Sequence, residues 1–290
     1  KEAVFAVLKN KFRVRQAVGS FNTEEGLSLA VLGDWNEEKL KIVSKFGPSG
    51  KKIQKTFFWL GIVVSSFFKL LFTPRLKYPE ILILEYGADR PGDIDRLVRF
   101  VSPKIGIVTG VGEIPVHVEY YSGPEEVAKE KSRLVSALPS KGLSILNHDD
   151  WTVFDMKGLS KAKTLTFGFD PHADINASDM RYFFDGNGMA SAGLSFKLNY
   201  NQASIPFRLA SALGKHQIYS ALAAAAVGLH FEMNLVEISE ALEKMEFPKQ
   251  RMRLWRGSKD SWVIDDTYNA SPLSTQDALE TLYEFGNKVG

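Results

Sequence analysis

Acidic side chains that could bind a cation follow two apolar runs of this 290-residue chain. Glu85 ends the run ILILE, and the run WVIDD ends on Asp265 and Asp266 before it continues into TYNASP. If ILILE is a strand of a parallel sheet, the Glu85 carboxylate lies at the edge where such sheets bind metals and phosphates. For Glu85 the alternative is an acid that pairs with a nearby Arg or Lys.

Basic and imidazole side chains form a second set of candidates. His117 follows the run IGIVTG, and its neutral imidazole could ligate a metal, although a single loop histidine is more often a surface residue. Lys131 ends the charged triplet Lys129–Lys131 at the edge of a helix's apolar face, which taken alone predicts a solvated lysine. Lys215 and His216 begin an alanine-rich segment, which is also typical of a core helix with polar cap residues.

The composition excludes several kinds of chemistry. The chain is 44% apolar and 24% charged, and its net charge of +2 gives no general signature of nucleic-acid or membrane binding. Cysteine is absent from the sequence, so disulfides, thiolate zinc sites and thiol nucleophiles are excluded, which fits a reducing cytoplasm. The phosphate-binding pattern G-x-x-x-x-G-K-[ST] does not occur, and GPSGKK at residues 47–52 lacks its spacing.

The apolar runs predict an α/β fold. ILIL and IGIVTGVG are short continuous runs separated by a helix that Asp93 can cap, which is typical of a βαβ unit and a parallel sheet. After Trp151, the segments KTLTFGF, DINASDMRYFF, GLSFKLNY and IPFRLA alternate in polarity and predict a small antiparallel subsheet. Alanine-rich and amphipathic patterns predict helices over residues 215–230 and 235–245.

Pro248 marks a break in this pattern. RMRLWRG and SWVIDD after it predict a hairpin, and a helix is expected over residues 274–284. We therefore expect a mostly parallel sheet flanked by helices, with a small antiparallel subsheet, in residues 1–246. Residues 247–290 are expected to begin a C-terminal α/β domain.

One segment is far more apolar than the rest. TFFWLGIVVSSFFKLLF, residues Thr56–Phe72, has basic residues on both sides and contains Lys69. It is shorter than the roughly 20 apolar residues that a membrane span needs, so a spanning helix is disfavoured. Two interpretations remain: a helix packed in a core or domain interface, and a helix that lies on a membrane surface.

Several stretches, taken together and in order, resemble the Mur ligase family. They span nearly the whole chain, and the combination is specific although each stretch alone is weak. The stretches are FNTEEGLSL, LEYGADRPGDI, VTGVGEIPVHVEYYSGPEEVAKEK, NHDD, GKHQIYSALAAAA and RMRLWRGSKDSWVIDDTYNASP.

The resemblance implies a role for most of the candidate residues. Glu85, His117 and a Lys131 that CO2 has converted to a carbamate would be the magnesium ligands, and His117 and Lys131 would be catalytic. The hard oxygen donors that magnesium prefers make such a set chemically reasonable. The ATP contacts would be His216, Arg251, Asp266, Tyr268 and Asn269, and the substrate contacts would be Asn22 and Thr23.

The activity implied by the resemblance is ATP-dependent amide ligation in the cytoplasm. ATP would phosphorylate the carboxylate of a UDP-MurNAc-tripeptide, and the amine of D-Ala-D-Ala would attack the acyl phosphate. DDTYNASP favours the members that add D-Ala-D-Ala over those that add earlier residues and over folylpolyglutamate synthetases. The implied partners are these two substrates, with ATP and Mg²⁺ as cofactors and no nucleic acid.

The sequence also departs from the family's pattern. The family's phosphate-binding loop would lie immediately before KEA, so we expect residues 1–290 alone to be an inactive fragment. Gln217 and Ser220 stand where the family usually has two asparagines, and the apolar region at about 47–78 looks like an insertion. The alternatives are a Mur-type ligase for another amino acid or for folate, and a non-catalytic scaffold that docks on a membrane through Thr56–Phe72.

Overall fold

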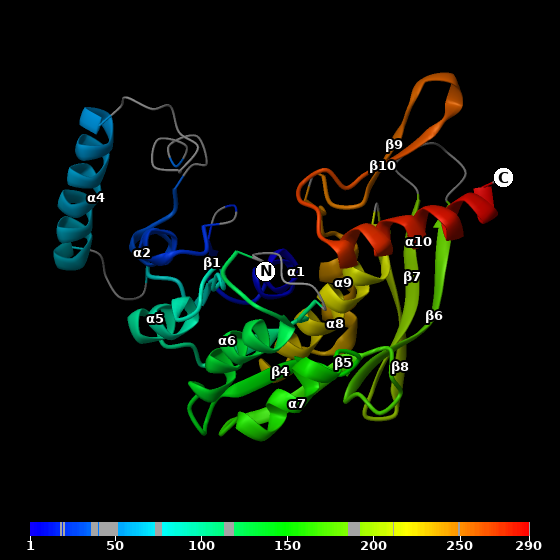
Figure 1. Cartoon of the computed structure of the whole chain (residues 1–290), viewed down its shortest axis with the longest axis horizontal. Helices are drawn as coiled ribbons and strands as arrows, with labels where there is room; N and C mark the ends of the chain where they lie inside the picture. Colours follow the sequence, from blue (N-terminus) through cyan, green and yellow to red (C-terminus); the bar gives the residue numbers. More distant parts are fainter. Residues whose placement is uncertain are drawn as a thin grey trace. The chain divides into compact units, whose positions relative to one another are not determined.

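The computed structural model describes residues 1–290 except 18, 20, 36–39, 41–51, 73–76, 113–118, 185–191, 211, 249 and 290. Two compact units divide the chain: unit 1 holds Lys1 and Leu8–Gly87, and unit 2 holds Glu2–Val7 and Ala88–Gly290. Figure 1 shows the elements in chain order. Because α1 (Glu2–Leu8) begins in unit 2, unit 1 is inserted between α1 and the rest of unit 2.

A six-stranded sheet forms the centre of unit 2, in the order β3-β4-β5-β6-β7-β8. β3 (Ile105–Val108), β4 (Leu143–Asn147) and β5 (Lys163–Gly168) are parallel, and the start of β6 (Ile175–Phe184) pairs in parallel with the end of β5. β4 is buried along its whole length, as expected for a parallel strand covered on both faces. The predicted parallel sheet is confirmed.

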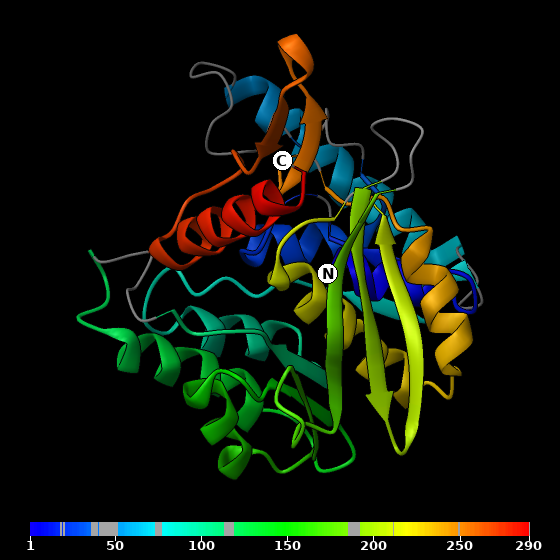
Figure 2. The same ribbon diagram turned by 90° about the vertical axis from the view of Figure 1, so that its right-hand side faces the viewer.

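The other half of the sheet is antiparallel. β6 pairs with β7 (Ala192–Tyr200), which pairs with β8 (Ala203–Ala210), and Figure 2 shows these long strands side by side. The predicted antiparallel subsheet is therefore confirmed for β6, β7 and β8. The expectation that KTLTFGF belongs to it is wrong, because β5 pairs in parallel with both neighbours and its last four residues are buried.

α8 (Lys215–His230) matches the predicted helix and packs on β4, β5 and β6. Its alanines are buried, which lets neighbouring elements approach closely. A β-carbon on Gly228 would lie 2.8 Å from Ile238 of α9 (Leu235–Glu243) and 2.9 Å from Val7 of α1. Both α9 and the first turns of α1 are thus packed against α8 within unit 2.

The remaining helices of unit 2 are short, apart from α6 and α10. They are α5 (Asp93–Phe100), α6 (Pro124–Ser136), α7 (Trp151–Asp155) and α10 (Pro272–Val289), with the 3-10 helices η2 (Met156–Leu159) and η4 (Ser258–Asp260).

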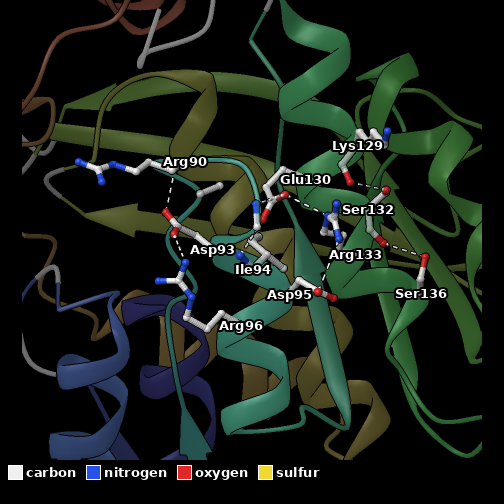
Figure 3. Close-up of polar contacts among 12 residues, drawn as sticks. Arg90, Asp93, Ile94, Asp95, Arg96, Lys129, Glu130, Ser132, Arg133 and Ser136 are labelled. Carbon is white, nitrogen blue, oxygen red and sulfur yellow. Dashed lines mark hydrogen bonds and ion pairs between the residues drawn. The ribbon is translucent and has the colours of Figure 1, made fainter. Parts of the chain in front are cut away.

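A buried carboxylate of α6 binds the N-terminus of α5. Glu130 accepts hydrogen bonds from the N–H of Gly92 at 2.9 Å and of Ile94 at 2.7 Å, and it lies 3.0 Å from Nε of Arg133 (Figure 3). The prediction that Asp93 caps α5 is wrong. Asp93 is the first helical residue, and the N–H groups at this terminus are bound by an acid from another helix instead.

A hairpin and a helix end unit 2. β9 (Arg253–Arg256) and β10 (Trp262–Asp265) form the predicted antiparallel hairpin, and α10 follows. Met252 and Phe285 are buried with Leu213 in a small core that joins these elements to the rest of unit 2. The domain boundary expected after residue 246 stays a prediction, since the division into compact units falls between residues 87 and 88.

The described part of unit 1 contains a short parallel strand pair and two helices. β1 (Val14–Gln16) pairs with β2 (Ile81–Ile83), and the helices are α2 (Glu24–Leu32) and α4 (Lys52–Phe72). The predicted strand, helix and strand are present as β2, α5 and β3, but the expectation that both strands share one parallel sheet is wrong for the described pairings. The two strands belong to different described sheets, because β2 pairs with β1 and β3 pairs with β4.

Candidate functional site

Lys131 is half-buried, although the residues around it taken alone predict a solvated side chain. Its Nζ donates a 2.5 Å hydrogen bond to the carbonyl oxygen of Gly110, just beyond the end of β3. Burial lowers the pKa of Lys131 from its ordinary value of 10.5, and the nearby Asp150 carboxylate acts in the opposite direction. The amine is therefore neutral more often than that of an exposed lysine, which makes it a better nucleophile.

Two acids connect the ends of the parallel strands. Asp150 caps α7 and also accepts a 2.6 Å hydrogen bond from the N–H of Val111, in the loop after β3. Asp149 accepts hydrogen bonds from the N–H of Phe169 at 2.6 Å and of Asp170 at 3.0 Å, both just after β5. The Asp150 bond fixes the loop after β3, which Lys131 contacts, and the Asp149 bonds fix the loop after β5.

Asn147 completes this polar group at the end of β4. Its Nδ2 donates a 2.9 Å hydrogen bond to the carbonyl oxygen of Thr109, and its Oδ1 accepts a 3.1 Å bond from the N–H of Asp149. The sequence assigned no role to Asn147, Asp149 or Asp150. The available signal was the stretch NHDD directly after the apolar run LSIL, at a strand's carboxyl end.

Tyr219 of α8 extends the group towards the start of that helix. Its hydroxyl donates a 2.8 Å hydrogen bond to Asp149, and its ring packs edge-on against Phe169 with the ring centres 5.3 Å apart. Burial raises the pKa of Tyr219, and the hydrogen bond to Asp149 and the charges of Asp277 and Asp150 raise it further. Asp149 and Asp150, just after β4, and Asp277 of α10 thus all raise the pKa of this hydroxyl.

His216 lies in the first turn of α8 and is half-buried. Burial lowers the pKa of His216 below its ordinary 6.5; Asp266 and Asp277 oppose this shift, and Arg251 adds to it. Gly214 has a φ of 86°, and a β-carbon there would lie 2.8 Å from the imidazole ring. At neutral pH the imidazole is therefore uncharged and packed closely against the loop that precedes it.

The two residues that depart from the family's asparagines are hydrogen-bonded within unit 2. Nε2 of Gln217 lies 3.1 Å from Nε2 of His216 and donates to the carbonyl oxygen of Arg251 at 3.5 Å. The Ser220 hydroxyl donates a 3.1 Å bond to the carbonyl oxygen of His216. Gln217 therefore connects His216 to the segment that precedes the C-terminal hairpin.

The C-terminal candidates flank the open end of that hairpin, where Arg253 pairs with Asp265. The guanidinium carbon of Arg251 lies 4.1 Å from the ring centre of Tyr268, and both side chains are exposed. Asp266 accepts a 3.1 Å bond from the N–H of Met252, and Asn269 accepts one from the N–H of the next residue at 3.0 Å. His216, Arg251, Asp266 and Tyr268 are thus linked, whereas the described bond of Asn269 lies within its own turn.

The three predicted magnesium ligands lie in different parts of the chain. Glu85 follows β2 in unit 1, is exposed, and lies 3.6 Å from Nζ of Lys1, which matches the alternative of a paired strand-end acid. Lys131 lies in unit 2, and His117 lies outside the described residues. Among the described residues no group of three His, Cys, Asp or Glu side chains could hold a metal.

The two predicted substrate residues lie together before α2. The carbonyl oxygen of Asn22 accepts a 3.0 Å bond from the N–H of Gly87, which follows β2. A β-carbon on Gly87 would lie 2.9 Å from the Asn22 side chain, so a larger residue at position 87 would require that side chain to move. The Thr23 hydroxyl donates a 2.8 Å bond to Glu25.

A parallel sheet with a half-buried lysine and several acids at its carboxyl ends is typical of α/β proteins that bind their ligands at that edge. Residues 66–228, more than half of the chain, match the family model described as the Mur ligase middle domain. The chain therefore belongs to the Mur ligase family.

Curated relatives agree with this assignment. A UDP-N-acetylmuramoyl-tripeptide–D-alanyl-D-alanine ligase of Bacillus subtilis is 25% identical over 292 residues, which cover all of this chain and 52% of the relative. A ligase of the same name from Mycobacterium tuberculosis is 32% identical over 211 residues, covering 72% of this chain and 39% of the relative. The chain thus spans about half the length, or less, of these relatives.

Solved structures show the same fold. MurF of Acinetobacter baumannii superposes with a TM-score of 0.73 at 20% identity, covering 98% of this chain and 51% of that one. MurF ligase of Thermotoga maritima, solved in complex with ADP, superposes with a TM-score of 0.72 at 23% identity, covering 98% and 53%. The predicted fold class, a mostly parallel sheet flanked by helices, is confirmed.

Proposed function

We propose that the protein carrying this chain is an ATP-dependent ligase that joins D-Ala-D-Ala to a UDP-MurNAc-tripeptide in peptidoglycan precursor synthesis. The names of the curated relatives and the stretch DDTYNASP support this choice. The observation that carries it is the half-buried lysine with a lowered pKa, held at the carboxyl end of β3 beside Asp150. A surface lysine with only a structural role would need neither burial nor a position at the carboxyl end of β3.

The proposed reaction forms one amide bond at the expense of one phosphoanhydride. The tripeptide carboxylate attacks the γ-phosphorus of ATP, which gives an acyl phosphate and ADP. The neutral amine of D-Ala-D-Ala then attacks the acyl carbon, inorganic phosphate leaves, and the amine loses a proton. Because the protein forms no covalent bond to substrate, its contribution is to position the reactants and to neutralise charge.

Lys131 has the chemistry needed for the proposed carbamate. Its neutral amine would attack CO2, a C–N bond would form, and loss of a proton would leave a carboxylate in place of a cation. Burial favours this step because it raises the neutral fraction of the amine. The carbamate would supply an oxygen donor of the kind that Mg²⁺ prefers, and Mg²⁺ would neutralise the phosphate charge when bound.

We also propose an ATP contact for the group at the start of α8. A neutral His216 can face the uncharged adenine, while the Arg251 guanidinium can pair with a phosphate or hydrogen-bond the ribose. Asp266, Tyr268 and Asn269 would complete this contact. Asn22 and Thr23 of unit 1 would contact the UDP-MurNAc-peptide.

The test is release of phosphate by the full-length protein that carries these 290 residues, with each candidate amine supplied in turn. We expect release that requires ATP, Mg²⁺, UDP-MurNAc-tripeptide and D-Ala-D-Ala together. Release with a different amino acid would indicate another Mur-type ligase, and release with a folate substrate would indicate a folylpolyglutamate synthetase. No release with any amine would favour the non-catalytic scaffold.

Residues 1–290 expressed alone form the second arm of this assay. The 290 residues contain no G-x-x-x-x-G-K-[ST] loop, so a polypeptide of these residues has no such loop to bind the transferred phosphate. We expect no ATP-dependent ligation from it. Turnover by residues 1–290 alone would show that this expectation is wrong.

A further inference from the structure

Helix α4 exposes a continuous apolar face. Phe57 and Phe72 near its two ends are 68% and 74% exposed. Residues three, four and seven apart lie on one face of a helix, and the exposed side chains follow this spacing. Eight large apolar side chains of α4 are exposed: Phe57, Leu60, Val63, Val64, Phe67, Phe68, Leu71 and Phe72.

The opposite face of α4 packs within unit 1. Ile62 is buried against Leu29 of α2, and Phe58 and Trp59 are partly buried in the same cluster. These positions account for part of the apolar character of the helix. The eight exposed side chains take no part in this cluster.

Lys69, Ser65 and Ser66 of α4 lie towards its packed side, whereas Thr56 is exposed. Nζ of Lys69 lies 5.5 Å from the ring of Trp35 and donates a 3.4 Å hydrogen bond to the carbonyl oxygen of Leu32. Ser65 and Ser66 are half-buried as well. An ordinary surface helix has its apolar stripe towards the core and polar residues outward, whereas the outward face of α4 is mostly apolar.

The charge around α4 indicates which apolar environment fits. Residues 39–79 contain nine Lys or Arg and no Asp or Glu, whereas the whole chain has a net charge of only +2. Lys55 in the first turn of α4 and the exposed Lys77 beyond its end belong to this set. Anionic lipids attract such basic segments, while two copies of the segment would repel each other.

We propose that α4 lies in the plane of an anionic bilayer surface, with its exposed apolar face between the headgroups and the acyl chains. None of the helices in the described ranges is long and apolar enough to cross a membrane. The division of α4 into an outer and an inner face suits a helix that lies flat, because only one side of it meets the lipid. The proposal adds a membrane attachment to the ligase and does not depend on its substrate.

The test is co-sedimentation of the full-length protein with phosphatidylcholine vesicles, with and without a large fraction of phosphatidylglycerol. The apolar variant replaces Phe57, Phe67 and Leu71 by Gln, which keeps helix propensity and leaves the packed Phe58 and Trp59 intact. We expect binding to the anionic vesicles that weakens with salt, and a partition coefficient at least about tenfold lower for the variant.

Matched variants control for general loss of surface hydrophobicity and of charge. Trp151, Leu159 and Val236 are exposed apolar residues of unit 2, and their replacement by Gln should leave binding unchanged. Lys55→Glu with Lys77→Glu should weaken binding to anionic vesicles, whereas the exposed pair Lys141→Glu and Lys163→Glu should have a smaller effect. Thermal unfolding of each variant checks that it folds.

Three outcomes would overturn the proposal. The protein could stay in solution with every vesicle, or the apolar variant could bind as well as the parent. The third is self-association in sedimentation velocity that is lost in the apolar variant without any vesicle binding, which would assign the face to a second copy.

Discussion

At the scale of single residues, Lys131 shows what a long-range contact adds to a local pattern. The helical repeat places Lys131 at the edge of an apolar face, where its side chain could equally be exposed to solvent. The hydrogen bond to Gly110 and the charge of Asp150 come from loops after two different strands. These contacts hold an amine of lowered pKa at the sheet edge.

Replacing Lys131 by Arg should abolish ligation while leaving the fold intact. Arg keeps the positive charge but cannot form a stable carbamate, so we expect ligation by the full-length protein to fall at least ~100-fold. Lys131→Met removes a half-buried ammonium and should not lower the melting temperature. The exposed Lys129 gives the control, since Lys129→Arg should keep full activity. A fully active Lys131→Arg enzyme would exclude the carbamate.

The lowered pKa of His216 predicts acid-sensitive stability. Its folded-state pKa lies below 6.5, so the unfolded chain binds this proton more readily. Unfolding therefore takes up a proton between the two values, and stability falls as the pH drops through 6.5. His216→Gln should flatten this dependence by at most ~1.4 kcal/mol per pH unit, measured by denaturant unfolding on both sides of 6.5.

His230 provides the comparison for this experiment, because it is exposed at the other end of the same helix. His230→Gln should leave the pH dependence nearly unchanged. Equal slopes for the parent and His216→Gln would show that burial of this imidazole does not contribute to acid sensitivity.

At the scale of elements, the N-terminus of α5 is bound by Glu130 of α6 and not by a capping side chain of its own. Two backbone N–H groups at the start of α5 and the guanidinium of Arg133 share this buried carboxylate. The helix terminus carries a partial positive charge, so a carboxylate there is favourable. The expected cap by Asp93 failed because this acid, 36 residues away from Ile94, occupies the site.

Glu130→Ala should destabilise the protein by about 2–4 kcal/mol, because it leaves buried N–H groups without an acceptor. The exposed Glu126, which accepts one bond from the N–H of Ser122, is the control on the same helix and should cost less than about 1 kcal/mol. Denaturant unfolding measures both. Equal losses of unfolding free energy for the two variants would mean that burial of Glu130 adds nothing to stability.

The elements themselves were well predicted where their patterns are local. The bounds of α8 and the C-terminal hairpin follow from alanine-rich and alternating segments, and the structure confirms both. KTLTFGF was misassigned because alternation in a short segment does not distinguish a parallel strand from an antiparallel one. Only its pairing with β4 and β6 decides the direction.

At the scale of the whole molecule, the order of the motifs was enough to recognise the family from the sequence. Much of the site could not be predicted from the sequence. Asp149 contacts residues 20, 21 and 70 positions away, so no local sequence pattern predicts that it belongs to this polar group. The apolar segment at 56–72 was left between a packed helix and a membrane-surface helix. The structure confirms packing for one face of α4, and the exposure of its other face leaves the membrane-surface helix as a proposal.

Unit 1 separates two segments of unit 2 in the sequence, and this arrangement affects where the chain can accept insertions. Val7 is packed against Gly228, and the chain returns to unit 2 only at Ala88, so both attachment points of the inserted unit are fixed by unit 2 itself. The entropic cost of closing a loop grows only with the logarithm of its length. Extra residues gained between these anchors therefore lengthen unit 1 without interrupting a strand of the six-stranded sheet, because all six of its strands follow Ala88.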